Sequence, residues 1–163
     1  MALWQYIPSQ VVISIGGLHE IVGIPDGEFV SVTKNNYAVK TYRALDGEKM
    51  RVFNNDNSYS LTISLVQSSP SNTVLDTLFK IDQLTRRGKF PVAISDLSGS
   101  SRFYCASAWI ETVPDMVFAN DLQINKWKIM CSDATMVIGD NTGSDAATTI
   151  NATLGVISAI GGL

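Results

Sequence analysis

The side chains best suited to catalysis are few in this chain, which has one histidine and two cysteines. A histidine serves as a general base when a nucleophile or a carboxylate is placed to share its proton. His19 stands in a strand-like segment outside any such motif, and the adjacent Glu20 would point to the opposite face of a strand. Cys105 and Cys131 lie in strand-like runs without metal-ligand spacing, a pattern typical of buried free thiols. We therefore predict no catalytic centre and no enzymatic activity.

The carboxylates are placed for turns. Asp26, Asp46, Asp56 and Asp121 fall among Gly, Asn and Ser residues, where an aspartate hydrogen-bonds the nearby backbone. The stretch 139–145 (GDNTGSD) resembles a calcium loop only faintly, because it lacks the alternating Asp/Asn ligands and the terminal Glu. No metal and no cofactor is expected.

Composition excludes further classes. The net charge is −3, and no basic cluster is longer than Arg86-Arg87, whereas nucleic-acid binders concentrate positive charge to neutralise phosphates. No run reaches the roughly 18 apolar residues of a membrane helix, and no signal peptide is visible, so we expect a cytoplasmic product. Only 17% of residues are charged, against about 25% in a typical domain. This fits either a Ser/Asn/Thr-surfaced β domain or a subunit that buries surface against its own copies.

Short alternating segments bounded by turn residues predict an antiparallel β-protein. The clearest is 59–67, with Leu61, Ile63 and Leu65 on one face. Asp46-Gly47 predicts a two-residue hairpin turn. We expect a mainly β fold with one α-helix, two antiparallel sheets packing as a sandwich or barrel. The predicted strands span 10–15, 19–24, 28–34, 37–45, 49–53, 59–67, 90–96, 102–111, 116–119, 122–131 and 135–138, with 116–119 and 122–131 forming a pair.

The single helix is predicted at about 70–87. Ser69 is expected as its N-cap and Pro70 as its first residue, where the missing N–H costs nothing. Gly88 is expected to end it. Its apolar stripe, which must pack on a sheet, follows a 3.6-residue period: Val74, Leu78 and Ile81.

Two segments are expected along the chain: a β domain over 1–138, and a Gly/Ser linker with an apolar C-terminal extension over 139–163. Within 150–160, apolar residues recur at even positions, which predicts a strand. That strand belongs either to the subunit's own sheet or to a neighbouring subunit, to which strand addition would donate it; a disordered end is the third alternative. The residues expected to contact a neighbour are Ile150, Leu154, Val156 and Ile160.

A set of motifs in a fixed order resembles the tail tube protein family of contractile-tailed bacteriophages. Segment 24–30 resembles the family's early Gly/Asp-Gly hairpin, and Asp46-Gly47 with Arg51 its second one. The strongest match is the strand from Leu61 that runs into a Gln-Ser-Ser-Pro-Ser-Asn helix start. The helix-start residues are Gln67, Ser68, Ser69, Pro70, Ser71 and Asn72, and Trp109, Pro114 and Trp127 continue the series.

The resemblance implies a fold similar to other tail tubes and to the inner tube of type VI secretion systems. It further implies hexameric rings stacked into a tube in the virion tail, assembled in the host bacterial cytoplasm. Expected partners are the tail sheath, baseplate and tube terminator proteins, with genomic DNA passing through unbound and no membrane involved. The segment 37–53, with its tip at Asp46 and Gly47, is our candidate for contact between rings. The acidic excess suits a lumen that does not hold phosphates.

Two alternatives remain open. A tube-like terminator or baseplate protein would form one ring without polymerising. A carbohydrate-binding β-sandwich would favour exposed aromatic residues at turns, whereas Trp4, Trp109 and Trp127 all lie within strand patterns. That placement favours a structural role over sugar binding.

Overall fold

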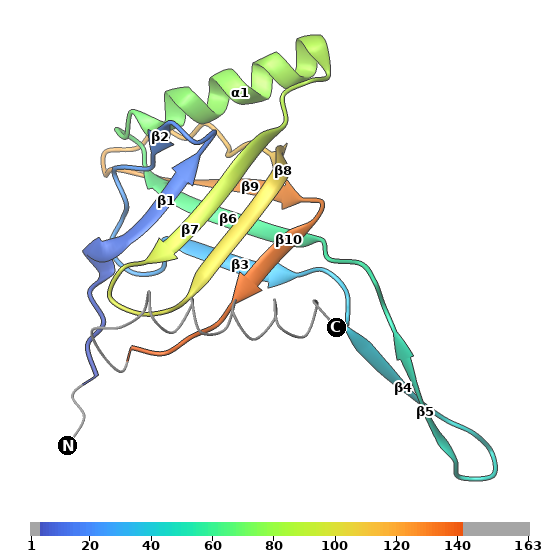
Figure 1. Cartoon of the computed structure of the whole chain (residues 1–163). Coiled ribbons are helices and arrows are strands. Elements are labelled where there is room, and N and C mark those ends of the chain that lie inside the picture. The colour runs from blue at the N-terminus through green and yellow to red at the C-terminus, as the bar shows by residue number, and fades with distance from the viewer. Residues whose placement is uncertain (1–3, 142–163) are drawn as a thin grey trace.

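The computed structural model describes residues 4–141, which form a β-rich body and one projecting hairpin (Figure 1). Each strand pairs antiparallel to its neighbours. The elements are η1 (Pro8–Gln10), β1 (Val11–Ile15), β2 (His19–Glu20), β3 (Val30–Lys34), β4 (Val39–Arg43), β5 (Lys49–Phe53), β6 (Tyr59–Val66), α1 (Ser71–Thr85), β7 (Phe90–Asp96), β8 (Arg102–Thr112), β9 (Ile124–Cys131) and β10 (Ala134–Val137).

The larger sheet has the order β2-β1-β7-β8-β9-β6-β3, and β10 also pairs with β8. The first part of β8 pairs with β10 and its last part with β9, so β8 changes partner near Ser107. There the Ser107 carbonyl accepts hydrogen bonds from the Ser132 amide (3.3 Å) and hydroxyl (3.2 Å). The sheet is bent (Figure 1), and the Tyr59 ring of β6 lies edge-on to the Phe103 ring of β8, with centroids 5.7 Å apart.

The expectation of a mainly β protein with one helix and two antiparallel sheets is confirmed. The second sheet is the β4–β5 hairpin alone, which extends away from the body (Figure 1). The larger sheet is not closed into a barrel: among the described strands, β3 pairs only with β6 and β10 only with β8. Its outer strands therefore keep backbone groups able to pair with another chain.

The core lies inside the bent sheet, and strand alternation explains it. On β6, Leu61, Ile63 and Leu65 are completely buried, as their period of two predicts. Residues from β1, β7, β8 and β9 belong to the same cluster, and Leu75 joins it from α1. Burying one such side chain stabilises the fold by about 1.5–3 kcal/mol.

Helix α1 covers one end of the body and differs from its prediction at both ends. Its N-cap is Pro70, not Ser69, although the Ser69 hydroxyl accepts a hydrogen bond from the Ser71 amide (3.2 Å). The left-handed C-cap is Arg86 (φ 57°), not Gly88. Gly88 is needed for close packing instead, because a Cβ there would lie 2.4 Å from the Asp82 Cβ.

The prediction of a strand at 116–119, paired with 122–131, is wrong. The chain from 113 to 123 is a loop between β8 and β9, and β9 pairs with β8 and β6. The apolar character of Met116 and Phe118 favours a strand, yet their side chains are 84% and 81% exposed. They follow Pro114, a residue that supplies no amide to a ladder. The predicted strand 19–24 also shortens to the two residues of β2.

Candidate assembly interface

The hairpin of β4 and β5, which with its flanks we call the arm (residues 37–53), exposes both of its faces. Every residue of both strands is exposed. Two apolar pairs are directly opposite in register: Val39 with Phe53, and Tyr42 with Met50. Monomeric proteins rarely leave a whole two-stranded ribbon without packing, because such a ribbon is marginal in water. The arm therefore has the exposure and apolar surface typical of a segment that packs against another molecule.

The tip of the arm is a three-residue loop rather than the predicted two-residue turn. The Gly47 amide donates to the Ala44 carbonyl (3.0 Å), and the Ala44 amide donates to the Glu48 carbonyl (2.8 Å). Gly47 has φ 93°, as the Asp-Gly pair predicts, and the Asp46 carboxylate accepts from the Glu48 amide (3.0 Å). The remaining loop residue, Leu45, is fully exposed at the tip.

The two faces of the arm differ in charge. One carries Arg43, Lys49 and Arg51, and the other is mainly apolar. Residues 37–53 hold four basic and two acidic side chains, a net charge of +2. The rest of the chain, with eight basic and thirteen acidic residues, has −5. The Arg51 guanidinium lies 5.2 Å from the centre of the Phe53 ring, so cation and aromatic surface are presented together.

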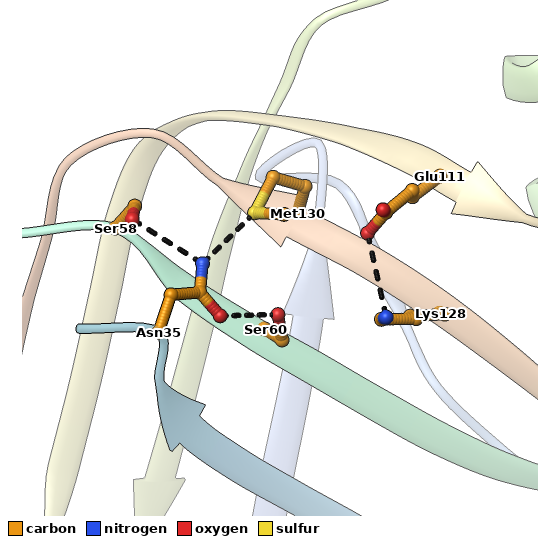
Figure 2. Close-up of polar contacts among 6 residues, drawn as sticks. All are labelled: Asn35, Ser58, Ser60, Glu111, Lys128 and Met130. Atoms are coloured by element: carbon orange, nitrogen blue, oxygen red, sulfur yellow. Dashed lines mark hydrogen bonds and ion pairs between the residues drawn. The ribbon is translucent and has the colours of Figure 1, made fainter.

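The base of the arm is fixed to the body by Asn35 (Figure 2). Its side-chain amide donates to the Ser58 hydroxyl (3.2 Å) and reaches the Met130 sulfur (3.1 Å), while its carbonyl accepts from the Ser60 hydroxyl (2.5 Å). These partners lie on or beside β6 and β9. Figure 2 also shows the Lys128–Glu111 ion pair (3.8 Å) that links β9 to β8 nearby. The arm thus leaves the body at a set position.

Asp56 orders the returning strand of the arm. The pKa of Asp56 is lowered chiefly by hydrogen bonds from the Asn36 side chain and then from the Ser58 hydroxyl and amide. The Lys34 ammonium also donates to the Asp56 carbonyl (3.0 Å). The predicted backbone-bonding role is thus confirmed for Asp56, as it is for Asp46 at the tip. Within residues 4–141, the carboxylates of Asp26 and Asp121 make no comparable hydrogen bond.

The strongest sequence motif joins three elements through Asn72. Its side-chain amide donates to the carbonyls of Val66 (3.0 Å) and Ser69 (3.1 Å), closing the passage from β6 into α1. Its side-chain carbonyl accepts from the Trp127 indole (2.9 Å) and the Asn125 amide (3.3 Å), both on β9. Trp127 is thereby buried with its polar atom satisfied.

The serines of the motif hold the segment after β2. The Ser69 hydroxyl donates to the Val22 carbonyl (2.5 Å), and the Ser71 hydroxyl accepts from the Val22 amide (3.0 Å). His19 bonds the same Ser71 hydroxyl through Nε2 (2.9 Å), which gives this histidine a structural contact. Gly23 packs so closely that a Cβ would lie 2.5 Å from the Ser69 Cβ. Ser68 and Pro70 are exposed beside these contacts.

A groove lies between α1 and the first part of the 113–123 loop, with a volume of about 540 Å³. Sequence reasoning missed this groove. The sequence signal that could have indicated it is the run Met116-Val117-Phe118. Three consecutive apolar residues do not fit the apolar–polar alternation of a strand with one exposed face. Gln67 supports the loop by donating to the Val117 carbonyl (3.1 Å). Of the motif residues, Gln67, Asn72, Pro114 and Trp127 all line the groove, whereas Trp109 is half-buried on β8 opposite Met130.

The predicted linker begins with residues that are held to the body. The Asp140 amide donates to the Ser100 hydroxyl (2.9 Å), and the Asn141 side chain donates to Asp96 (3.3 Å). Burial favours a higher pKa for Asp96, but hydrogen bonds from the Ser98 hydroxyl and amide and from Asn141 lower it overall. The remaining predicted contact residues, Ile150, Leu154, Val156 and Ile160, lie outside the described residues.

The histidine and the two cysteines have structural surroundings: His19 bonds the Ser71 hydroxyl, and the cysteines lie in the core. Both cysteines are buried, and burial together with the neighbouring Cys105 raises the pKa of Cys131 to about 12. Across residues 4–141, no three His, Cys, Asp or Glu side chains gather as a metal site. No helix in the described part of the chain is long and apolar enough to cross a membrane.

The fold is shared with chains of solved contractile assemblies. It is similar to the tube-terminating cap of the anti-feeding prophage (TM-score 0.58, 14% identity, 84% of this chain and 93% of that chain). It also resembles a chain of the PVC sheath/tube terminator in the extended state (0.57, 18%, 83% and 99%). A chain of the PVC sheath–tube complex in the extended state is likewise similar (0.56, 20%, 82% and 91%).

Sequence comparison extends this from fold to family. Residues 9–139 match the model of the bacteriophage PhiTE tail tube protein family. The chain is also 33% identical over 150 residues to the structural protein ORF10 of Pseudomonas phage KPP10, covering 88% of this chain and 87% of that protein. The chain therefore belongs to the PhiTE-type phage tail tube family, as its motifs indicated.

Proposed function

We propose that this chain is the repeating subunit of a phage tail tube, forming hexameric rings that stack into the conduit for DNA within a contractile tail. The single observation that best supports stacking is the arm, a ribbon exposed along its whole length and anchored at its base by Asn35. Asp46 and Gly47 at its tip are the proposed contacts with the next ring.

Ring formation is supported by the open outer strands of the larger sheet. Unpaired backbone groups along β3 and β10 favour pairing with another subunit, and a closed ring would remove these edges. A contact between unlike surfaces closes into a ring when its rotation divides a full turn. Sheath, baseplate and terminator proteins are the proposed further partners, in a virion tail assembled in the host cytoplasm.

Electron microscopy of negatively stained purified protein over a concentration series tests this proposal. Long hollow tubes or stacked six-membered rings are expected. Discrete rings that never stack, even with a nucleating baseplate, would assign the chain to a single-ring terminator or baseplate role instead. A protein that stays monomeric in the presence of a baseplate would refute both.

The C-terminal extension is proposed to contact a neighbouring subunit through Ile150, Leu154, Val156 and Ile160. Truncation should follow Asn141, because residues 139–141 are bonded to the β7–β8 turn and their removal would disturb the body. Loss of tubes with an unchanged unfolding temperature is the expected result. Unimpaired tubes would contradict the contact.

The acidic excess outside the arm supports passage of DNA without binding. A lumen lined by carboxylates repels phosphates, so genomic DNA would slide through. Assembled tubes are expected not to retain double-stranded DNA at low salt in a co-sedimentation assay. Salt-sensitive retention would contradict a negative lumen.

A further inference from the structure

The arm and the groove lie at opposite ends of the molecule. Figure 1 shows the arm extending away from the body at the end opposite α1, which covers the other end together with the loop between β8 and β9. A subunit's arm is therefore far from its own groove. It would be directed toward the groove of a second copy placed below it in the same orientation.

The two surfaces are complementary in charge. The arm presents Arg43, Lys49 and Arg51 on one face, and among residues 4–141 none of these forms an ion pair. Asp115 lines the groove and Asp121 lies in the same loop; both are exposed and likewise without an ion-pair partner in the described chain. The other charged lining residues, Asp76 and Lys80, form an ion pair with each other (2.7 Å), so the net charge of the groove lining is negative. Complementary charges of this kind set partner choice and register.

The two surfaces are also complementary in apolar character. The arm ends in Leu45, which is fully exposed, and the exposed pair Tyr42 and Met50 lies near the tip on the mainly apolar face. The groove is lined by apolar side chains from both walls, and its volume of about 540 Å³ is within the range of binding pockets. The apolar lining residues are Phe79, Val113, Pro114, Met116, Val117, Phe118 and Trp127.

From this complementarity we infer that the groove between α1 and the 113–118 segment is the receptor for the arm of a second copy of this chain. Leu45 enters the apolar part, and the basic face of the arm lies against Asp115 and Asp121. This deepens the proposed function by naming the surface that receives the arm, and it rests on that function. Because arm and groove are different surfaces at opposite ends of the molecule, the contact is head-to-tail, and copies stacked in one orientation repeat it along a column.

Charge exchange tests the inference in the full-length chain. Arg43→Glu with Arg51→Glu in the arm is expected to raise the concentration needed for tube formation at least about tenfold, through repulsion from the groove. Asp115→Lys with Asp121→Lys should have the same effect. The four changes together should restore tubes, because the attraction is then re-formed with opposite signs.

A control separates docking from net charge. Arg87→Glu with Lys89→Glu alters the total charge by the same amount as the arm variant, at exposed sites outside both surfaces. This variant should assemble like the unaltered protein. An equal loss in the control, or no recovery in the combined variant, would overturn the inference. Tubes formed normally by all the variants would also overturn it while leaving the tail tube function intact.

Disulfide trapping supplies a test that does not require tubes. Leu45→Cys and Met116→Cys variants are prepared separately, mixed and oxidised, since the native cysteines are buried. The mixed dimer is expected to exceed both self-dimers severalfold, and 0.5 M salt should reduce its yield. Random yields would overturn the groove as receptor. Failure of the unaltered protein to form rings or tubes, with the mixed disulfide still formed, would count against the proposed function alone.

Discussion

The body and the arm are both antiparallel β-structure with apolar residues at alternate positions, yet only one of them has a core. On β6 the alternate residues Leu61 and Ile63 are fully buried, whereas on β5 the corresponding residues Met50 and Val52 are about half exposed. The difference is that the bent sheet packs against itself, while the two strands of the hairpin stay exposed among the residues that the structure describes. Alternation in the sequence therefore specifies a strand and its two faces. It does not specify which element or which subunit covers the apolar face.

Thiol reactivity gives the largest expected contrast between the two regions. Burial raises the pKa of Cys131 to about 12, so little thiolate exists at pH 8. A cysteine placed at Leu45 on the arm should react with an aromatic disulfide reagent on the order of a thousandfold faster than either native cysteine. Both native thiols should react once denaturant is added. Fast reaction of native thiols in the folded protein would show that the body is not a rigid core.

Matched leucine truncations compare stability directly. Leu61→Ala removes a fully buried side chain and should lower the free energy of unfolding by about 2–5 kcal/mol in urea denaturation. Leu45→Ala, at the exposed tip, should change it by less than about 0.5 kcal/mol. Similar losses for the two variants would mean that the arm is packed in the isolated subunit, which would contradict the comparison.

Replacing two asparagines compares the hydrogen bonds that hold the body together with those that hold the base of the arm. Asn72→Ala leaves the buried Trp127 indole without its acceptor and should cost about 1–3 kcal/mol, measured by urea denaturation. Asn35→Ala removes exposed contacts at the base of the arm and should cost about 1 kcal/mol or less. Its effect should instead be faster amide hydrogen exchange in β4 and β5. Unchanged exchange there would show that Asn35 does not orient the arm.

Acid should produce the smallest effect, and in a defined direction. The pKa values of Asp56 and Asp96 are lowered in the folded protein, so their contribution is present above the ordinary carboxyl pKa of about 3.9 and is lost as pH falls through the folded values. NMR should show the Ser58 and Ser98 amides shifting only below about pH 4. A shift near neutral pH would contradict the lowered values. Asp56→Asn should remove the response at Ser58.

Features of the fold that depend on residues close in sequence could be predicted, and features that depend on residues far apart in sequence could not. The bounds of β5 and β7 are those predicted, because their alternation and flanking turns are local. The change of partner at Ser107 depends on Ser132, and the capping of α1 depends on neighbours in space, so neither is visible in a local pattern. Resemblance identifies the motif residues, but the hydrogen bond that the Trp127 indole donates to Asn72 spans 55 positions and has no sequence signal.

The arm projects from only one end of the subunit, so a column of stacked subunits would have two different ends. One tip would display basic hairpins and the other acidic grooves, so subunits would join the two tips at different rates. Elongation would then have a preferred direction, and a capping factor would need to match only one of the two chemistries. Length control would reduce to competition at a single tip between the next ring and the cap.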